Sequence, residues 1–113
     1  TNLKGLEKLT QLTRLTLSDN QLTDVTGLEK LTQLTRMVLN HNQLTDVTGL
    51  EKLDKLKELE LYDNKLTKLP EGLENLTQLK TLHLDNNPAL TYAQFDELQK
   101  ALPDCYIYSH DFK

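Results

Sequence analysis

Few side chains in this sequence have the type and spacing that acid–base chemistry requires. Glu58 and Glu60 alternate along an extended segment, so both carboxylates would stand on one face of a strand, where they could act as general acid and general base. That chemistry needs a pocket with an apolar wall that shifts the pKa of one carboxyl group, and no neighbouring segment supplies one. We interpret the two glutamates as surface residues, and the sequence predicts that the chain is not an enzyme.

The side chains that could bind a metal ion are too scattered to form a site. His41 and His83 fall on strands that are not adjacent, roughly 10 Å apart, and His110 lies near the end of the chain. A zinc ion holds its ligands at about 2 Å. Asp24 and Asp46 recur at equivalent positions without an EF-hand calcium loop around them, so we interpret them as turn or cap residues. We predict neither a metal nor a cofactor.

Composition limits the class of protein and of partner. The 113 residues allow one domain, and with no Trp, two Phe and a hydrophobic fraction of 37% the core must be built from leucine. The net charge of −4 argues against nucleic acid or an anionic membrane as partner, and no apolar run is long enough to span a bilayer. No signal peptide is present, but Thr1 is not an initiator Met, so the localisation, cytoplasmic or secreted, stays open.

Internal repetition is the strongest pattern in the chain. Residues 11–32 and 33–54 agree at 17 of 22 positions, and four of the five differences fall between residues 15 and 19 of the first block. The frame L-x-x-L-x-L-x-x-N-x-L recurs four times, and its asparagines are 22, 22 and 23 residues apart. They are Asn20, Asn42, Asn64 and Asn87. A constant scaffold with one variable stretch indicates stacked structural units.

Each unit predicts one short strand and one return, which is the segment that leads back to the start of the next strand. Leu15 and Leu17 alternate with polar residues, as in a half-buried strand, and leucine or valine at 22, 25, 28 and 31 recurs every three residues, as in a 3₁₀-like return. One unit cannot bury its leucines, so the units must stack with parallel strands about 4.8 Å apart. Each Asn falls at the turn after a strand, which predicts a ladder of stacked amides. The Glu-Lys pairs at 7–8, 29–30 and 51–52 are interpreted as a solvated convex face.

The C-terminal residues predict a cap. Thr91-x-x-Gln94 is a capping-box pattern, and Phe95, Leu98 and Leu102 follow at helical spacing before Pro103 ends the helix. A last strand is predicted at 106–108. Cys105 is the single cysteine, so no intrachain disulfide can form; a packed cap residue is its default interpretation, and an intermolecular disulfide stays open if the thiol is exposed.

The N-terminal residues predict an uncapped end. Leu3–Leu9 closely matches Val25–Leu31, so the chain begins inside the second half of a repeat. Either the chain is a piece of a longer solenoid or another chain covers this end. The strand Leu12–Ser18 would then have an unpaired edge, and we predict self-association there, most simply a homodimer.

The repeats resemble the leucine-rich repeat family over about residues 3–90. The segment V-T-G-L-E-K-L is similar to the 22-residue class of phosphatase-regulatory subunits and bacterial internalins, and L-P-E-G-L in the third unit is similar to the 23-residue bacterial or plant-type variant. The resemblance implies a right-handed α/β solenoid with a curved parallel sheet and a C-terminal helix-strand cap. It divides one domain, residues 1–113, into a partial repeat (1–10), four repeats (11–32, 33–54, 55–77, 78–90) and a cap (91–113).

The resemblance also implies that outward strand residues line a concave surface. A rigid sheet carrying varied polar and aromatic side chains suits protein recognition, because little entropy is lost on binding. We predict a non-catalytic protein–protein interaction module; the alternative is a structural or engineered fragment of a larger repeat protein with no ligand of its own. The predicted protein-binding residues are Arg14, Thr16, Ser18, Arg36, Val38, Asn40, His41, Glu58, Glu60, Tyr62, Asp63, Thr81, His83 and Asp85.

Two features of this surface refine the prediction. Tyr62 is aromatic and central, so it is the first candidate for a dominant contact, with His83 and Val38 next. Arg14 and Arg36 lie toward one end and the acidic residues toward the other, which would orient a partner of complementary charge. An ordinary mixed surface is the alternative interpretation of the charges.

Overall fold

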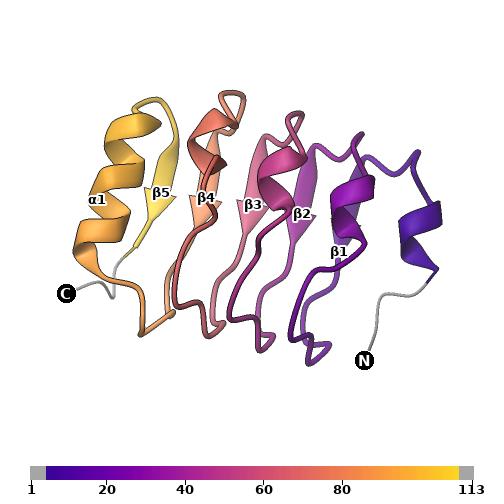
Figure 1. Ribbon diagram of the computed structural model, residues 1–113, viewed down its shortest axis with the longest axis horizontal. Coiled ribbons are helices and arrows are strands. Elements are labelled where there is room, and N and C mark those ends of the chain that lie inside the picture. The colour runs from indigo at the N-terminus through magenta and orange to yellow at the C-terminus, as the bar shows by residue number, and fades with distance from the viewer. Residues whose placement is uncertain (1–4, 110–113) are drawn as a thin grey trace.

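The chain folds into a parallel sheet of one short strand per repeat. The computed structural model describes residues 5–109. The strands lie in chain order, β1-β2-β3-β4-β5, and every neighbouring pair is parallel (Figure 1). They are β1 (Arg14–Thr16), β2 (Arg36–Val38), β3 (Glu58–Glu60), β4 (Thr81–His83) and β5 (Tyr106–Tyr108). The predicted repeat solenoid, with a strand after its last helix, is confirmed.

The returns between strands form a second layer on one side of the sheet (Figure 1). Each 3₁₀ return follows a glycine with positive φ, for example 99° at Gly27 and 114° at Gly49, a region that side chains with a Cβ rarely adopt. The predicted three-residue period is therefore a 3₁₀ helix, and the capping helix is the one α-helix of residues 5–109. These elements are η1 (Leu6–Lys8), η2 (Leu28–Lys30), η3 (Leu50–Lys52), η4 (Leu73–Asn75) and α1 (Tyr92–Ala101).

Leucines from the strands and the returns fill the space between the two layers. The core is closed from the second half of the first repeat onward: Leu28, Met37 and Leu59 all have 0% of their surface exposed. The strand half of the first repeat is less buried. Leu12 and Leu15 are only partly buried, and Leu9 is 49% exposed. Stacking on both sides buries a repeat, so burial falls off at the N-terminal end of the described residues.

The predicted asparagine ladder is present from the second repeat onward. The Asn42 side-chain oxygen accepts hydrogen bonds from the backbone N–H of Asn20 and Leu22, both at 3.0 Å. Its Nδ2 donates to the carbonyls of Leu17 and Leu39, also at 3.0 Å. Asn64 and Asn87 repeat this arrangement and are 3% and 1% exposed.

Asn20 differs from the other three asparagines. It is half-buried, and its Nδ2 donates to the Ser18 carbonyl at 2.9 Å. No strand precedes β1 among residues 5–109, so Asn20 has no earlier turn to join. The predicted ladder is present at Asn42, Asn64 and Asn87, and Asn20 joins it through its backbone N–H, which donates to Asn42.

The glutamates of the Glu-Lys pairs do more than solvate the surface. Glu29 Oε1 accepts a hydrogen bond from the Gly27 N–H at 2.8 Å, and Glu51 Oε1 accepts one from Gly49 at 2.7 Å. Glu7 bonds Gly5 in the same way, and backbone N–H groups of Glu7 itself and of Gly5 hold the pKa of Glu7 below its usual value. Each glutamate thus satisfies the free N–H that starts its 3₁₀ turn.

The C-terminal cap forms as the sequence predicts. Gln94 N donates to Thr91 Oγ1 at 3.2 Å, and Gln94 Oε1 accepts from Thr91 N at 2.8 Å, which completes the capping box. Gln99 Nε2 donates to the Leu102 and Cys105 carbonyls and so joins α1 to β5. Cys105 is 4% exposed and burial raises the pKa of its thiol to about 11, so its role as a packed cap residue is confirmed.

Some expectations fall on residues that the structure does not describe: Leu3 and Lys4 at the beginning and His110 at the end lie outside residues 5–109. Within that range, no helix has the length and apolar character needed to cross a membrane. In the same residues, no three His, Cys, Asp or Glu side chains are grouped so that they could hold a metal ion.

Candidate protein-binding surface

The sheet side opposite the 3₁₀ helices carries ordered rows of side chains. We call it the open sheet face. Parallel pairing in register places equivalent residues of successive repeats next to each other. One row contains Arg14, Arg36, Glu58, Thr81 and Tyr106. The next row contains Thr16, Val38, Glu60, His83 and Tyr108.

The predicted binding residues differ widely in exposure. Arg14, Thr16, His41, Glu58 and Tyr62 are exposed. The half-buried ones are Ser18, Arg36, Asn40, Glu60, Asp63, Thr81, His83 and Asp85. Thirteen of the fourteen positions therefore retain surface on which a partner could pack, and whether one does so stays a prediction.

Val38 is the exception. Only 6% of its surface is exposed, so its selection as a second-choice contact residue was wrong. Val38 is in register between Thr16 and Glu60, and the Arg36–Glu60 ion pair crosses the sheet beside it. A short branched side chain is shielded by longer neighbours on the same face.

Arg36 neutralises part of the predicted charge split. Its guanidinium lies 3.3 Å from a carboxylate oxygen of Glu58 and 3.3 Å from one of Glu60. Asn40 Nδ2 donates to the other Glu60 oxygen at 2.8 Å. Arg36 therefore belongs to the acidic part of the face, and Arg14 is left as the positive end of the split.

A second polar group occupies the turns at the ends of the strands. His41 Nδ1 lies 2.7 Å from Asp63 Oδ2, and Asn86 Nδ2 donates to Asp63 Oδ1 at 3.1 Å. The Tyr62 ring meets the His41 ring edge-on at a centroid distance of 5.2 Å. The Tyr62 backbone N–H also donates to Asn40 Oδ1 at 2.8 Å, so neighbouring repeats fix the position of this exposed tyrosine.

The backbone explains one of the differences between the twin repeats. Asp19 and His41 have φ values of 61° and 59°, and Asp63 and Asn86 share this left-handed conformation at 59°. Among residues with a Cβ, Asn, Asp and His adopt this region most readily. The Asp19/His41 difference therefore satisfies a turn requirement, and it is weaker evidence for recognition than the differences on the strands.

Sequence reasoning missed two residues of the open sheet face. Tyr106 and Tyr108 of β5 continue its two rows, in register with Thr81 and His83. Tyr106 is 63% exposed, and the Tyr108 ring stacks on His83 at a centroid distance of 4.0 Å. The alternation of tyrosine around Ile107 could have identified them, because an inward isoleucine places both neighbours on the outer face.

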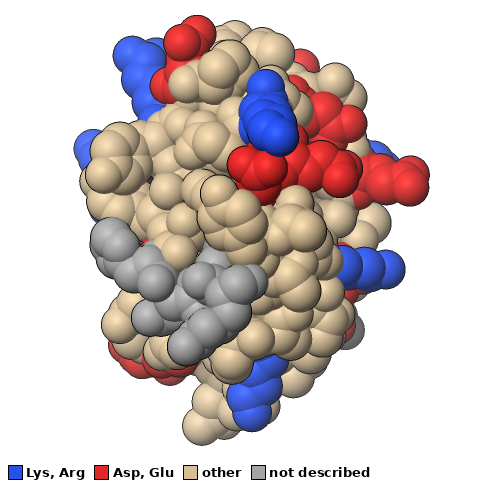
Figure 2. Space-filling model, turned by 90° about the vertical axis from the view of Figure 1, so that its left-hand side faces the viewer, with Lys and Arg blue, Asp and Glu red and all other residues tan. Residues whose placement is uncertain are grey.

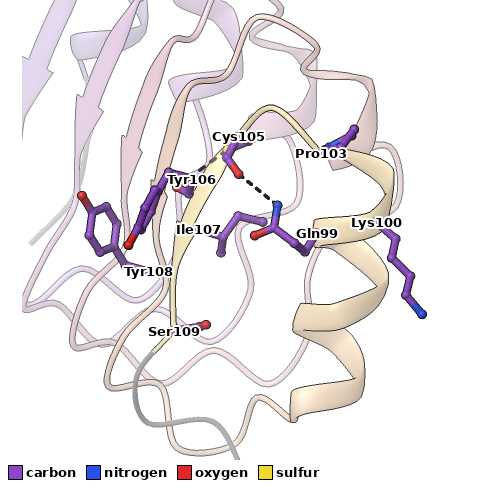
Figure 3. Close-up of a pocket in the computed structure, with 8 residues that line it drawn as sticks. All are labelled: Gln99, Lys100, Pro103, Cys105, Tyr106, Ile107, Tyr108 and Ser109. Carbon is purple, nitrogen blue, oxygen red and sulfur yellow. Dashed lines mark hydrogen bonds between the residues drawn. The ribbon is translucent and has the colours of Figure 1, made fainter.

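A cavity lies between α1 and β5 (Figure 3). It has a volume of about 560 Å³, and its walls include Cys105, Ile107 and Gln99. Lys100 points away from it into solvent, as Figure 3 shows. Burial raises the pKa of the Cys105 thiol in its wall, and the Gln99 amide already bonds two carbonyls.

A second groove, of about 400 Å³, lies beside η4 and α1. Leu69, Pro70 and Leu98 contribute apolar walls, and Glu71, Glu74 and Glu97 also line it. Figure 2 views the molecule from the C-terminal end and shows acidic side chains gathered on one flank, with uncharged side chains covering much of the rest.

Solved structures of several other proteins are similar to this chain. An internalin (InlF) of Listeria monocytogenes is 30% identical with a TM-score of 0.87, over 96% of this chain and 31% of that one. A leucine-rich repeat protein of Leptospira interrogans is 34% identical with a TM-score of 0.84, over 95% and 28%. TLR13, solved in complex with a single-stranded RNA, is 30% identical with a TM-score of 0.65, over 74% and 13%.

The chain thus spans less than a third of the length of each of these proteins. A search of curated proteins finds no significant match. The family model for leucine-rich repeats (2 copies) matches three overlapping segments, residues 10–52, 32–74 and 54–100. These segments contain β1–β4, η2–η4 and most of α1. The chain belongs to the leucine-rich repeat family.

Proposed function

We propose that this chain binds a protein partner on its open sheet face and has no catalytic activity. Leucine-rich repeat proteins generally mediate protein–protein interactions and are typically not enzymes. The observation that supports this face is the exposed Tyr62, whose backbone N–H donates to Asn40 and whose ring packs edge-on against His41. An aromatic side chain that is already ordered loses little entropy when a partner covers it.

Site-specific photo-crosslinking tests the proposal. A photoreactive residue replaces Thr16 or Thr81 on the open sheet face, and Lys52 on η3 serves as the matched position on the other layer. The face positions should form a covalent adduct with one identified protein, and excess untagged chain should compete it away. Equal or stronger adducts from position 52 would contradict binding on the open sheet face.

A second contact is proposed at the N-terminal end, where the chain would pair with a copy of itself as a homodimer. Leu9 is 49% exposed, and Leu12, Leu15 and Leu17 are partly buried, whereas their equivalents Leu31, Leu34, Met37 and Leu39 are fully buried. Unsatisfied apolar surface beside a strand edge favours association. Sedimentation should show a dimer at micromolar concentration that Leu9→Lys dissociates; a monomer at all concentrations would contradict the dimer.

The single-domain extent of residues 1–113 and the repeat boundaries are part of the same proposal. If the repeats share one core, urea unfolding followed by circular dichroism and by tyrosine fluorescence should give coincident transitions. Two separate transitions would contradict a single cooperative domain.

A further inference from the structure

The C-terminal end of the open sheet face carries three aromatic side chains in contact, His83, Tyr106 and Tyr108, which we call the aromatic cluster. His83 and Tyr108 stack with their rings inclined by 7°, and the Tyr106 and Tyr108 centroids are 4.6 Å apart. Ile107 points toward α1 and the two tyrosines point to the other side of β5 (Figure 3). Tyr106 is the ring most open to a partner, since 63% of its residue surface is exposed.

Carboxylates lie to one side of the aromatic cluster, on β3 and in the turns that follow β3 and β4. Glu60 is in register with His83, and Asp85 follows β4 two residues after His83. Glu58 and Asp63 lie on the same part of the face. The rows and turns contributed by β3, β4 and β5 contain no Lys or Arg among their described face positions. This part of the surface therefore attracts cations and repels phosphate groups.

The β3 part of this face already holds one guanidinium. Arg36 reaches across from β2 and contacts both Glu58 and Glu60 at 3.3 Å. A guanidinium can also lie flat on an aromatic ring while its edge donates hydrogen bonds to carboxylates, which an ammonium group does less well. Aromatic faces beside carboxylates thus favour arginine over lysine.

We propose that the aromatic cluster binds an arginine side chain of a protein partner, with the guanidinium on Tyr106 and the negative charge of the acidic side chains on β3 and after β4 attracting it. This rests on the proposed function, which it deepens by naming the chemistry of the partner. Bases of a single-stranded RNA also stack on tyrosines, but their phosphates would meet Glu60 and Asp85. The negative charge of the face therefore favours an arginine-bearing protein over a single-stranded RNA.

The test is a set of NMR titrations of the ¹⁵N-labelled chain with three probes: capped hexa-arginine, capped hexalysine and hexauridylate. Hexa-arginine should shift the amide signals of β4 and β5, bind severalfold more tightly than hexalysine, and weaken as salt is added. Equal affinity for the two peptides would overturn the aromatic part of the proposal. Binding of the RNA in preference to hexa-arginine would overturn it altogether.

Variants locate the interaction. Tyr106→Ala should weaken hexa-arginine binding roughly threefold, the effect of losing one exposed cation–π contact. Tyr92→Ala is the matched control, because Tyr92 is 53% exposed on α1 and lies outside the open sheet face, and it should leave the affinity unchanged. Asp85→Asn should weaken binding while leaving Tyr106 in place. Equal losses in Tyr92→Ala and Tyr106→Ala would contradict the site.

Failure of this inference is distinguishable from failure of the proposed function. If photo-crosslinking from Thr16 and Thr81 succeeds but Tyr106→Ala leaves both the partner and hexa-arginine bound, the open sheet face binds its partner without an arginine at this cluster. If hexa-arginine binds at β4 and β5 while crosslinking favours position 52, the aromatic cluster binds arginine as proposed. The protein partner is then bound on a face other than the open sheet face.

Discussion

The side-chain oxygen of Asn42 accepts a hydrogen bond from the backbone N–H of Leu22 at 3.0 Å, although the two residues belong to successive repeats. The same oxygen accepts a bond from Asn20 N, and the amide nitrogen donates to carbonyls of both repeats. One side chain therefore supplies hydrogen-bond partners to backbone groups in the turns of two successive repeats, where the strands are no longer paired. These bonds hold the open sheet face in a fixed register.

Asn42→Ala should lower the free energy of unfolding by about 1–3 kcal/mol, because buried backbone groups lose their partner. Asn20→Ala is the matched control: Asn20 is half-buried and bonds within its own turn, so its loss should be smaller. Urea denaturation of both variants measures the difference. A loss in Asn42→Ala no larger than that in Asn20→Ala would contradict the ladder.

The Cys105 thiol should react slowly in the folded chain. Its pKa is raised to about 11 by burial, so at pH 8 the thiolate population is about 100-fold below that of an ordinary cysteine. Reaction with an aromatic disulfide reagent should therefore accelerate sharply when the chain is unfolded in denaturant. Equal rates with and without denaturant would show that the thiol is accessible.

The same thiol makes stability depend on alkaline pH. Because the folded-state pKa lies above the ordinary value of 9.0, the unfolded chain releases the proton first as pH rises. The thiol's contribution to folding is complete below pH 9 and is lost as pH rises toward 11. The stability difference between the wild type and Cys105→Ala should shrink over that interval, and a constant difference would contradict the shift.

Asp46 should titrate below an ordinary aspartate. The Thr48 hydroxyl donates to Asp46 Oδ1 at 2.6 Å, and this bond, with the Thr48 backbone N–H and Lys68, holds the pKa of Asp46 below 3.8. Its contribution to stability is present above the ordinary carboxyl pKa and lost as pH falls through the lowered value. Thr48→Val should raise the pKa of Asp46 in an NMR titration, and an unchanged titration would refute this cause.

The periodic sequence predicted most of the fold, because stacking allows few alternatives. Alternation around Leu15 predicted β1, spacing by three predicted η2, and the pattern from Thr91 predicted α1; all three are confirmed. Periodicity identifies which residues face inward, and nearly all of the core follows from that alone.

The surface was less predictable, because it depends on contacts between side chains of different repeats. The burial of Val38 and the pairing of Arg36 with Glu58 and Glu60 depend on which long side chains cross the sheet. Tyr106 joins the face only once β5 is paired with β4 in register. Periodicity predicts on which face of the sheet a side chain lies. It does not predict which neighbour a long, flexible side chain contacts on that face.

The affinity of the crosslinked partner for four purified variants tests the central claim most directly. Tyr62→Ala and Glu60→Ala change the open sheet face, while Lys30→Ala and Lys52→Ala change exposed positions on the opposite layer and leave the glutamates that bond Gly27 and Gly49 intact. The account predicts that all four fold and that the face variants weaken binding, Tyr62→Ala by about 2 kcal/mol, while the lysine variants bind as the wild type. Full affinity in both face variants, with the loss confined to Lys30→Ala or Lys52→Ala, would contradict recognition by the open sheet face.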